Sequence, residues 1–111
     1  MNMEITEVDL PNFLVLNQSH NIEVSIARKD NCTYFQGFDV FTEENGTTTV
    51  VAIGSVLTEE DCSTSEENLS GIFTIEVQNV PFYMFRFYNG EDENGNAQYL
   101  EHMVPVVDGV N

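Results

Sequence analysis

Residues 71–88 read GIFTIEVQNVPFYMFRFY, and this stretch decides the fold class. In its first half, Phe73, Ile75 and Val77 alternate with polar side chains, which is the pattern of a strand with one buried face. Pro81 interrupts the run because it has no backbone N–H to donate to a sheet. An almost wholly apolar run then spans Phe82 to Tyr88. The stretch therefore predicts two consecutive β-strands.

The rest of the chain repeats this arrangement of short β-rich runs separated by turn clusters. Asn45-Gly46 is a strong signal for a hairpin turn. Thr58 to Ser70 is polar and acidic, so we expect a long loop there, with one helical turn at Ser65–Asn68. The other expected strands are Met3 to Leu10, Asn12 to Leu16, Asn21 to Ala27, Thr33 to Thr42, Thr47 to Leu57 and Gln98 to Val107.

About eight strands, with turn signals roughly every eight to twelve residues, are typical of two packed sheets. We therefore expect an all-β fold, a single antiparallel β-sandwich of the Ig-like or jelly-roll-like kind. It would occupy residues 1–111 as one domain. A small closed barrel is the alternative.

The chain is strongly acidic. The chain has nineteen Asp and Glu residues and only three basic ones, Arg28, Lys29 and Arg86, so the formal net charge is −16. Such a surface repels nucleic acid and anionic membranes, because phosphate binding needs Lys and Arg. It suits solubility, a basic partner or a salty environment. We therefore expect a protein partner, with no nucleic acid and no membrane, and a homo-oligomer stays open.

The N-terminal residues show neither the basic nor the apolar region of a signal peptide, and no apolar run approaches the ~20 residues of a membrane span. We therefore expect synthesis in a cytoplasm. Two cysteines in such a chain favour free thiols, although Cys32 and Cys62 could also pair. Four Asn-x-Ser/Thr sequons are then expected to be chance products of composition: Asn17, Asn31, Asn45 and Asn68.

Nothing in the sequence assembles a catalytic site. A nucleophile needs a base beside it, most often His. The two histidines, His20 and His102, accompany no G-x-S-x-G elbow and no basic pocket around a cysteine. The acidic residues gather in loop tips, where no apolar setting would raise the pKa of one carboxyl for acid catalysis. We therefore predict no enzyme, no catalytic residue and no cofactor.

The acidic turn Asn89–Asn96 carries hard oxygen ligands that suit a cation such as Ca²⁺. Its candidate ligands are Glu91, Asp92 and Asn94. The glycine and glutamate positions of an EF-hand are absent. We therefore expect a solvated hairpin turn there, and no metal.

The run from Phe82 to Tyr88 is apolar on both faces, whereas a sandwich strand ordinarily buries one. The larger rings are assigned to the core: Tyr83, Phe85 and Phe87. The other face then presents the predicted interface residues Phe82, Met84, Arg86 and Tyr88. Aromatic side chains with Met and Arg are typical of a protein interface. The alternative is that the chain's own Thr58–Ser70 segment covers this face.

Residues 35–41 (FQGFDVF), 44–48 (ENGTT) and 51–55 (VAIGS) form a strand pair, which residues 71–77 (GIFTIEV) and 80–87 (VPFYMFRF) follow. Over roughly residues 33–107 this pattern resembles small β-sandwich virion proteins of tailed phages. Ig-like and discoidin-like carbohydrate modules share much of it. The resemblance implies a virion location and an accessory role, as a capsid decoration, head-fibre or tail component. The acidic segment Thr58–Ser70 departs from the pattern.

Two other classes of protein fit parts of the sequence. An acidic inhibitor that mimics nucleic acid and blocks a host defence nuclease fits the net charge, but mimicry needs carboxylates spaced along a surface. A carbohydrate-binding module needs exposed aromatic side chains. Since the chain has no Trp, its candidates are Tyr34, Tyr83, Tyr88 and Tyr99.

Overall fold

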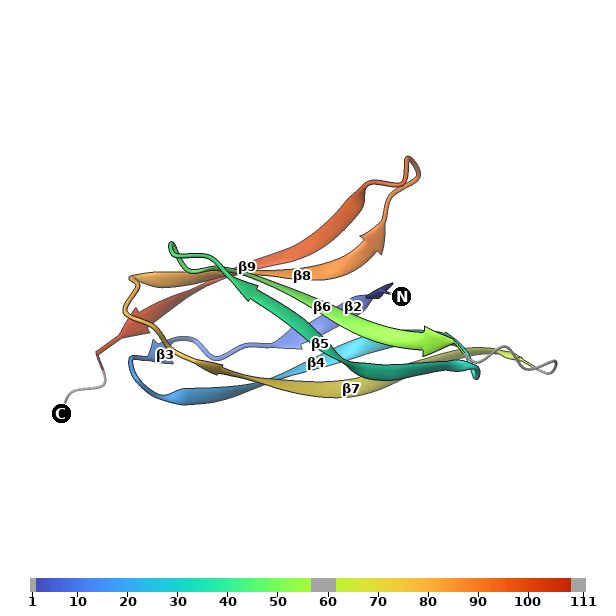
Figure 1. Ribbon diagram of the computed structural model, residues 1–111, viewed down its shortest axis with the longest axis horizontal. Helices are drawn as coiled ribbons and strands as arrows, with labels where there is room; N and C mark the ends of the chain where they lie inside the picture. Colours follow the sequence, from blue (N-terminus) through green and yellow to red (C-terminus); the bar gives the residue numbers. More distant parts are fainter. Residues whose placement is uncertain (1, 57–61, 109–111) are drawn as a thin grey trace.

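The structure is a computed structural model that describes residues 2–56 and 62–108 (Figure 1). This part of the chain consists of strands and connections without a helix, so the predicted all-β class is confirmed. Its strands are β1 (Asn2–Met3), β2 (Ile5–Asp9), β3 (Leu14–Val15), β4 (Ser19–Asp30), β5 (Thr33–Thr42), β6 (Thr47–Val56), β7 (Thr64–Glu76), β8 (Phe82–Glu91) and β9 (Ala97–Val107).

The larger sheet holds six of these strands and is mixed. β5 runs antiparallel along one edge of β6, and β1 and β8 share the opposite edge. β9 follows β8 as an antiparallel hairpin, and the short β3 lies beside β9. The pairs β6–β8 and β3–β9 are parallel, so the prediction of antiparallel pairing throughout is wrong for this sheet. Between β6 and β8 the chain crosses to the other sheet as β7 and returns, which lets β8 enter in the direction of β6.

The smaller sheet is antiparallel, in the order β2-β4-β7. β7 begins at Thr64, so the loop predicted for Thr58–Ser70 is wrong from Thr64 onward, and the helical turn predicted at Ser65–Asn68 is wrong. Residues 58–61 of the predicted loop lie outside the described residues. This polar segment is extended because its backbone pairs with β4. Its Glu67 also lies opposite Arg28, with 3.5 Å between the carboxylate Oε2 and the guanidinium Nη1.

One hydrophobic core lies between the two sheets. The alternating side chains of β4 and β7 point into it, as predicted: Ile22, Val24, Ile26, Phe73 and Ile75. From the larger sheet, Tyr83, Phe85 and Phe87 stack in a row with ring centroids 5.6 and 5.8 Å apart. All three rings are buried, so their assignment to the core is confirmed. Burying one such ring stabilises the fold by about 1.5–3 kcal/mol.

The β5–β6 hairpin turns at Asn45-Gly46, as predicted. Gly46 has a φ of 91°, in the left-handed region that favours glycine. A Cβ at this position would meet the backbone oxygen of Phe82, and the Gly46 carbonyl accepts a hydrogen bond of 3.1 Å from the Met84 N–H. The turn therefore packs closely against the start of β8.

Cys32 and Cys62 form a disulfide, with their Cα atoms 5.5 Å apart. The prediction of free thiols is therefore wrong. The β4–β7 register places Asp30 opposite Thr64, which brings together the residues just beyond these strand ends. Asn31 and Ser63 join the same corner: the Ser63 N–H donates to Asn31 Oδ1 at 2.9 Å, and the Asn31 N–H donates to the Ser63 carbonyl at 3.1 Å.

Candidate functional site

The outward side chains of β8 form rows with those of β9. Because Tyr83, Phe85 and Phe87 point into the core, the alternate residues of β8 lie on the other side of the sheet. In the register, Phe82, Met84, Arg86 and Tyr88 lie opposite Pro105, Met103, Glu101 and Tyr99. The structure thus brings all four predicted interface residues onto one face.

Two further apolar side chains belong to this face. Met103 of β9 is 62 % exposed and lies opposite Met84. Phe41 of β5 is also 62 % exposed, and the register through Thr49 of β6 places it in the same row as Arg86. We define the outer face as Phe41, Phe82, Met84, Arg86, Tyr88, Tyr99 and Met103. The sequence alone did not single out Phe41 or Met103, because strand register decides their place.

Arg86 has partners within the outer face. Its guanidinium carbon lies 4.2 Å from the centroid of the Tyr99 ring, and its Nε lies 3.7 Å from Oε2 of Glu101. The Glu101 side chain is well exposed, so this ion pair contributes little to stability. The Tyr99 ring and the Glu101 carboxylate both contact the guanidinium, which has further N–H donors for another molecule.

Tyr88 packs edge-on against Tyr99, with ring centroids 6.1 Å apart. Burial, and then the negative charge of Glu91, raise the pKa of the Tyr88 phenol above its usual value. The phenol therefore stays neutral at physiological pH and can donate a hydrogen bond at the rim of the outer face.

The chain's own segment was the alternative cover for this face. Thr64–Ser70 pairs with β4 in the smaller sheet, on the far side of the core, so this part of the segment does not cover the outer face. Residues 58–61 lie outside the described residues.

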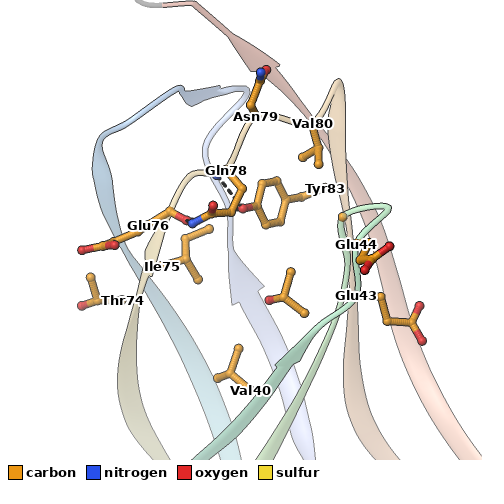
Figure 2. A pocket seen from close by; sticks show the side chains of 12 residues that line it. Val40, Glu43, Glu44, Thr74, Ile75, Glu76, Gln78, Asn79, Val80 and Tyr83 are labelled. Atoms are coloured by element: carbon orange, nitrogen blue, oxygen red, sulfur yellow. Dashed lines mark hydrogen bonds between the residues drawn. The ribbon is translucent and has the colours of Figure 1, made fainter.

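A cleft with a volume of about 710 Å³ opens between the end of β7 and the turn that joins β5 to β6 (Figure 2). Glu43 and Glu44 stand on one side of it and Glu76 on the other (Figure 2). The Tyr83 hydroxyl is fixed at its inner wall, where it accepts a hydrogen bond of 2.8 Å from the Gln78 backbone N–H. The sequence alone does not reveal the cleft, because its two sides come from different sheets: Glu76 belongs to β7, and Glu43 and Glu44 to the turn after β5.

The two histidines lie in separate settings. His20 Nε2 accepts a hydrogen bond of 3.1 Å from the Val15 backbone N–H, so His20 helps to hold β3 near β4. His102 is exposed on β9, with its ring centroid 6.4 Å from that of Phe87. Within residues 2–56 and 62–108, neither imidazole is hydrogen-bonded to a hydroxyl or a thiol.

The candidate cation ligands lie in and beside the β8–β9 turn. Asp92 Oδ1 accepts hydrogen bonds of 2.9 Å from the backbone N–H groups of Asn94 and Asn96. These bonds, the one from Asn96 first, lower the pKa of the Asp92 carboxyl. The carboxylate therefore caps its own turn. In the described part of the chain, no three His, Cys, Asp or Glu side chains gather in a way that could hold a metal ion.

Comparison of the chain with family models, with curated proteins and with solved structures finds no match of any of the three kinds. Among the described residues there is also no helix long and apolar enough to cross a membrane.

Proposed function

We propose that this chain is a non-enzymatic structural and binding module that docks on a protein assembly through its outer face. In this proposal the two sheets act as a β-sandwich scaffold, Ig-like or jelly-roll-like, whose larger sheet presents the contact surface. The assembly is a phage particle, on which the chain is an accessory component of the capsid or tail, made in the host cytoplasm. The resemblance of residues 33–107 to small virion proteins of tailed phages is the support for placing the chain on a phage particle.

The exposed apolar side chains of the outer face carry the proposal. Phe82 is 39 % exposed, and Phe41 and Met103 are more exposed still. Large apolar side chains in contiguous rows on a soluble domain mark interaction surfaces more often than isolated exposed ones do. Aromatic side chains, Met and Arg are also the residues enriched at the centres of protein interfaces. An oriented Arg86 beside Tyr88 and Tyr99 adds directional contacts to this apolar area.

The test replaces Met84→Glu and, separately, Arg86→Glu. The matched control is Ile72→Glu, because Ile72 is 60 % exposed on the outward side of the smaller sheet and lies opposite Glu23, as Arg86 lies opposite Glu101. We expect all three variants to fold, with unchanged far-UV circular dichroism. Met84→Glu and Arg86→Glu should fail to join particles assembled in place of the wild-type chain, whereas Ile72→Glu should join. Normal incorporation of both outer-face variants would overturn the proposal.

One of the four tyrosines that the carbohydrate-binding alternative needs on the surface is buried. Tyr83 is 2 % exposed and its hydroxyl is hydrogen-bonded inside the protein, so it offers no face to a sugar ring. Tyr34 is 44 % exposed, but the Arg28 guanidinium carbon lies 5.4 Å from its ring centroid. Tyr88 and Tyr99 meet edge to face instead of forming a flat stacking platform.

A further inference from the structure

The strand β5 has one unpaired edge. It pairs with β6 from Thr33 to Thr42, and no other strand of the described residues pairs with it. Natural proteins commonly protect such an edge with Lys, Pro, a bulge or a short strand. β5 is ten residues long and contains neither Lys nor Pro. Its bulge lies at Gln36, between Phe35 and Gly37, which leaves residues 38–42 as a regular edge.

The outermost strand of the smaller sheet, β7, lies beside this edge. The rings of Phe38 and Phe73 meet at 5.5 Å between centroids, so the two strands are close in the middle of the molecule. Toward the β5–β6 turn they diverge, and the cleft of about 710 Å³ opens between them (Figure 2). Val40 of β5 and Ile75 of β7 supply apolar side chains to its two walls. An added strand would find backbone partners on β5 and apolar contacts on both sides.

The charge on the cleft is of one sign. Glu43, Glu44 and Glu76 line it, and among the described side chains no Lys, Arg or His does. Among the described side chains, the ion pairs Arg28–Glu67 and Arg86–Glu101 involve none of these three carboxylates. Glu43 and Glu44 lie at the rim of the cleft beside the β5–β6 turn and Glu76 at the opposite rim, with the carboxylates of Glu43 and Glu76 turned outward (Figure 2).

We propose that this cleft binds an extended basic segment of a partner protein, which adds a strand to the free edge of β5. Main-chain hydrogen bonds to residues 38–42 supply affinity, as in other cases of β-strand addition. Alternate side chains of the segment divide between the apolar walls and the carboxylates, to which Lys or Arg pairs. A second copy of this chain is disfavoured as the occupant, because each copy carries a net charge of −16 and three basic residues. This binding mode is distinct from docking through the outer face.

The probe is a capped peptide of alternating lysine and valine, long enough to pair with residues 38–42. A second peptide has the same composition with N-methylated backbone nitrogens, which keeps the charge and removes the hydrogen-bond donors. Binding is measured at physiological salt by titration calorimetry, and the site by amide chemical shifts and hydrogen exchange. We expect the first peptide to bind at least tenfold more tightly and to protect backbone amides of residues 38–42.

Two variants with equal changes in net charge locate the charge effect. Glu43→Gln, Glu44→Gln and Glu76→Gln together neutralise the cleft, whereas Glu7→Gln, Asp9→Asn and Glu23→Gln together neutralise an exposed patch on β2 and β4. We expect the cleft variant to weaken binding about tenfold or more and the control to weaken it less than twofold. Equal weakening by both variants, or equal binding of the N-methylated peptide, would show unspecific attraction to an acidic surface and overturn the proposal. So would protected amides that lie away from β5.

Discussion

Removing the disulfide should cost this domain a large part of its stability. The bond closes a loop with a sequence separation of 30, between the end of β4 and the start of β7. The loop-entropy relation then gives about 12 cal/mol/K, or about 3.6 kcal/mol at 25 °C, lost from the stability of the folded state. For a chain of this size that corresponds to a fall in Tm of roughly 10–20 °C. Because Cys32 is buried, alanine is a better replacement there than serine, and the test is Cys32→Ala with Cys62→Ala.

The assay is urea denaturation followed by far-UV circular dichroism, for the wild type with and without a phosphine reductant and for the double variant. Reduced wild type and double variant should unfold at the same lower urea concentration, and the reductant should not affect the variant. Hydrogen exchange should rise first at the Asn31–Ser63 corner, where the disulfide is the covalent tie. A midpoint that reductant leaves unchanged, or two reactive thiols in the unreduced unfolded protein, would refute the reasoning.

Three further predictions follow, the first two of which compare matched residues. Gly46→Ala should destabilise the fold more than Gly95→Ala in thermal melts. Both glycines have a positive φ, which costs other residues about 1–3 kcal/mol. A Cβ at Gly46 would also meet the backbone of Phe82, whereas a Cβ at Gly95 would meet open space. Phe85→Ala should lower the free energy of unfolding in urea by about 3–5 kcal/mol, whereas the exposed Phe41→Ala should change it little. Asp92 has a lowered pKa in the folded state, so its stabilising effect is present above its unfolded pKa and disappears as pH falls through the folded pKa. The stability difference between Asp92→Asn and wild type should therefore vanish in strong acid, and carboxyl NMR titration should place the Asp92 pKa below 3.8.

The core could be predicted from the sequence because alternation reports burial locally. Phe73 and Ile75 on β7 point inward as their two-residue period indicates. Phe85 and Phe87 on β8 belong to a run that is apolar on both faces, and ring size assigns them correctly to the core. The segment Thr64–Ser70 has no apolar alternation, and its strand structure comes from backbone pairing with β4. No local pattern contains that information.

Long-range register explains what else the sequence could not supply. The parallel pairing of β6 with β8 depends on where β7 travels between them. The outer face contains Phe41 and Met103 because β5 and β9 align with β8 in one particular register. The cleft has Glu76 on one side and Glu43 on the other, from different sheets. The sequence could predict that Phe82, Met84, Arg86 and Tyr88 share one face of β8, whereas their neighbours on that face needed the fold.

The disulfide also separates the proposed functions by the compartment in which each would act. An inhibitor of a host nuclease works in the cytoplasm, where thiol reductants keep cysteines reduced. There the domain would lose about 3.6 kcal/mol, a large share of the 5–15 kcal/mol by which domains are typically stable. A component of a released particle meets an oxidising exterior, in which the Cys32–Cys62 bond persists. The disulfide therefore supports docking on a particle over inhibition inside a cell. The measurement that distinguishes the two functions is the redox state of Cys32 and Cys62 in the chain bound to isolated particles.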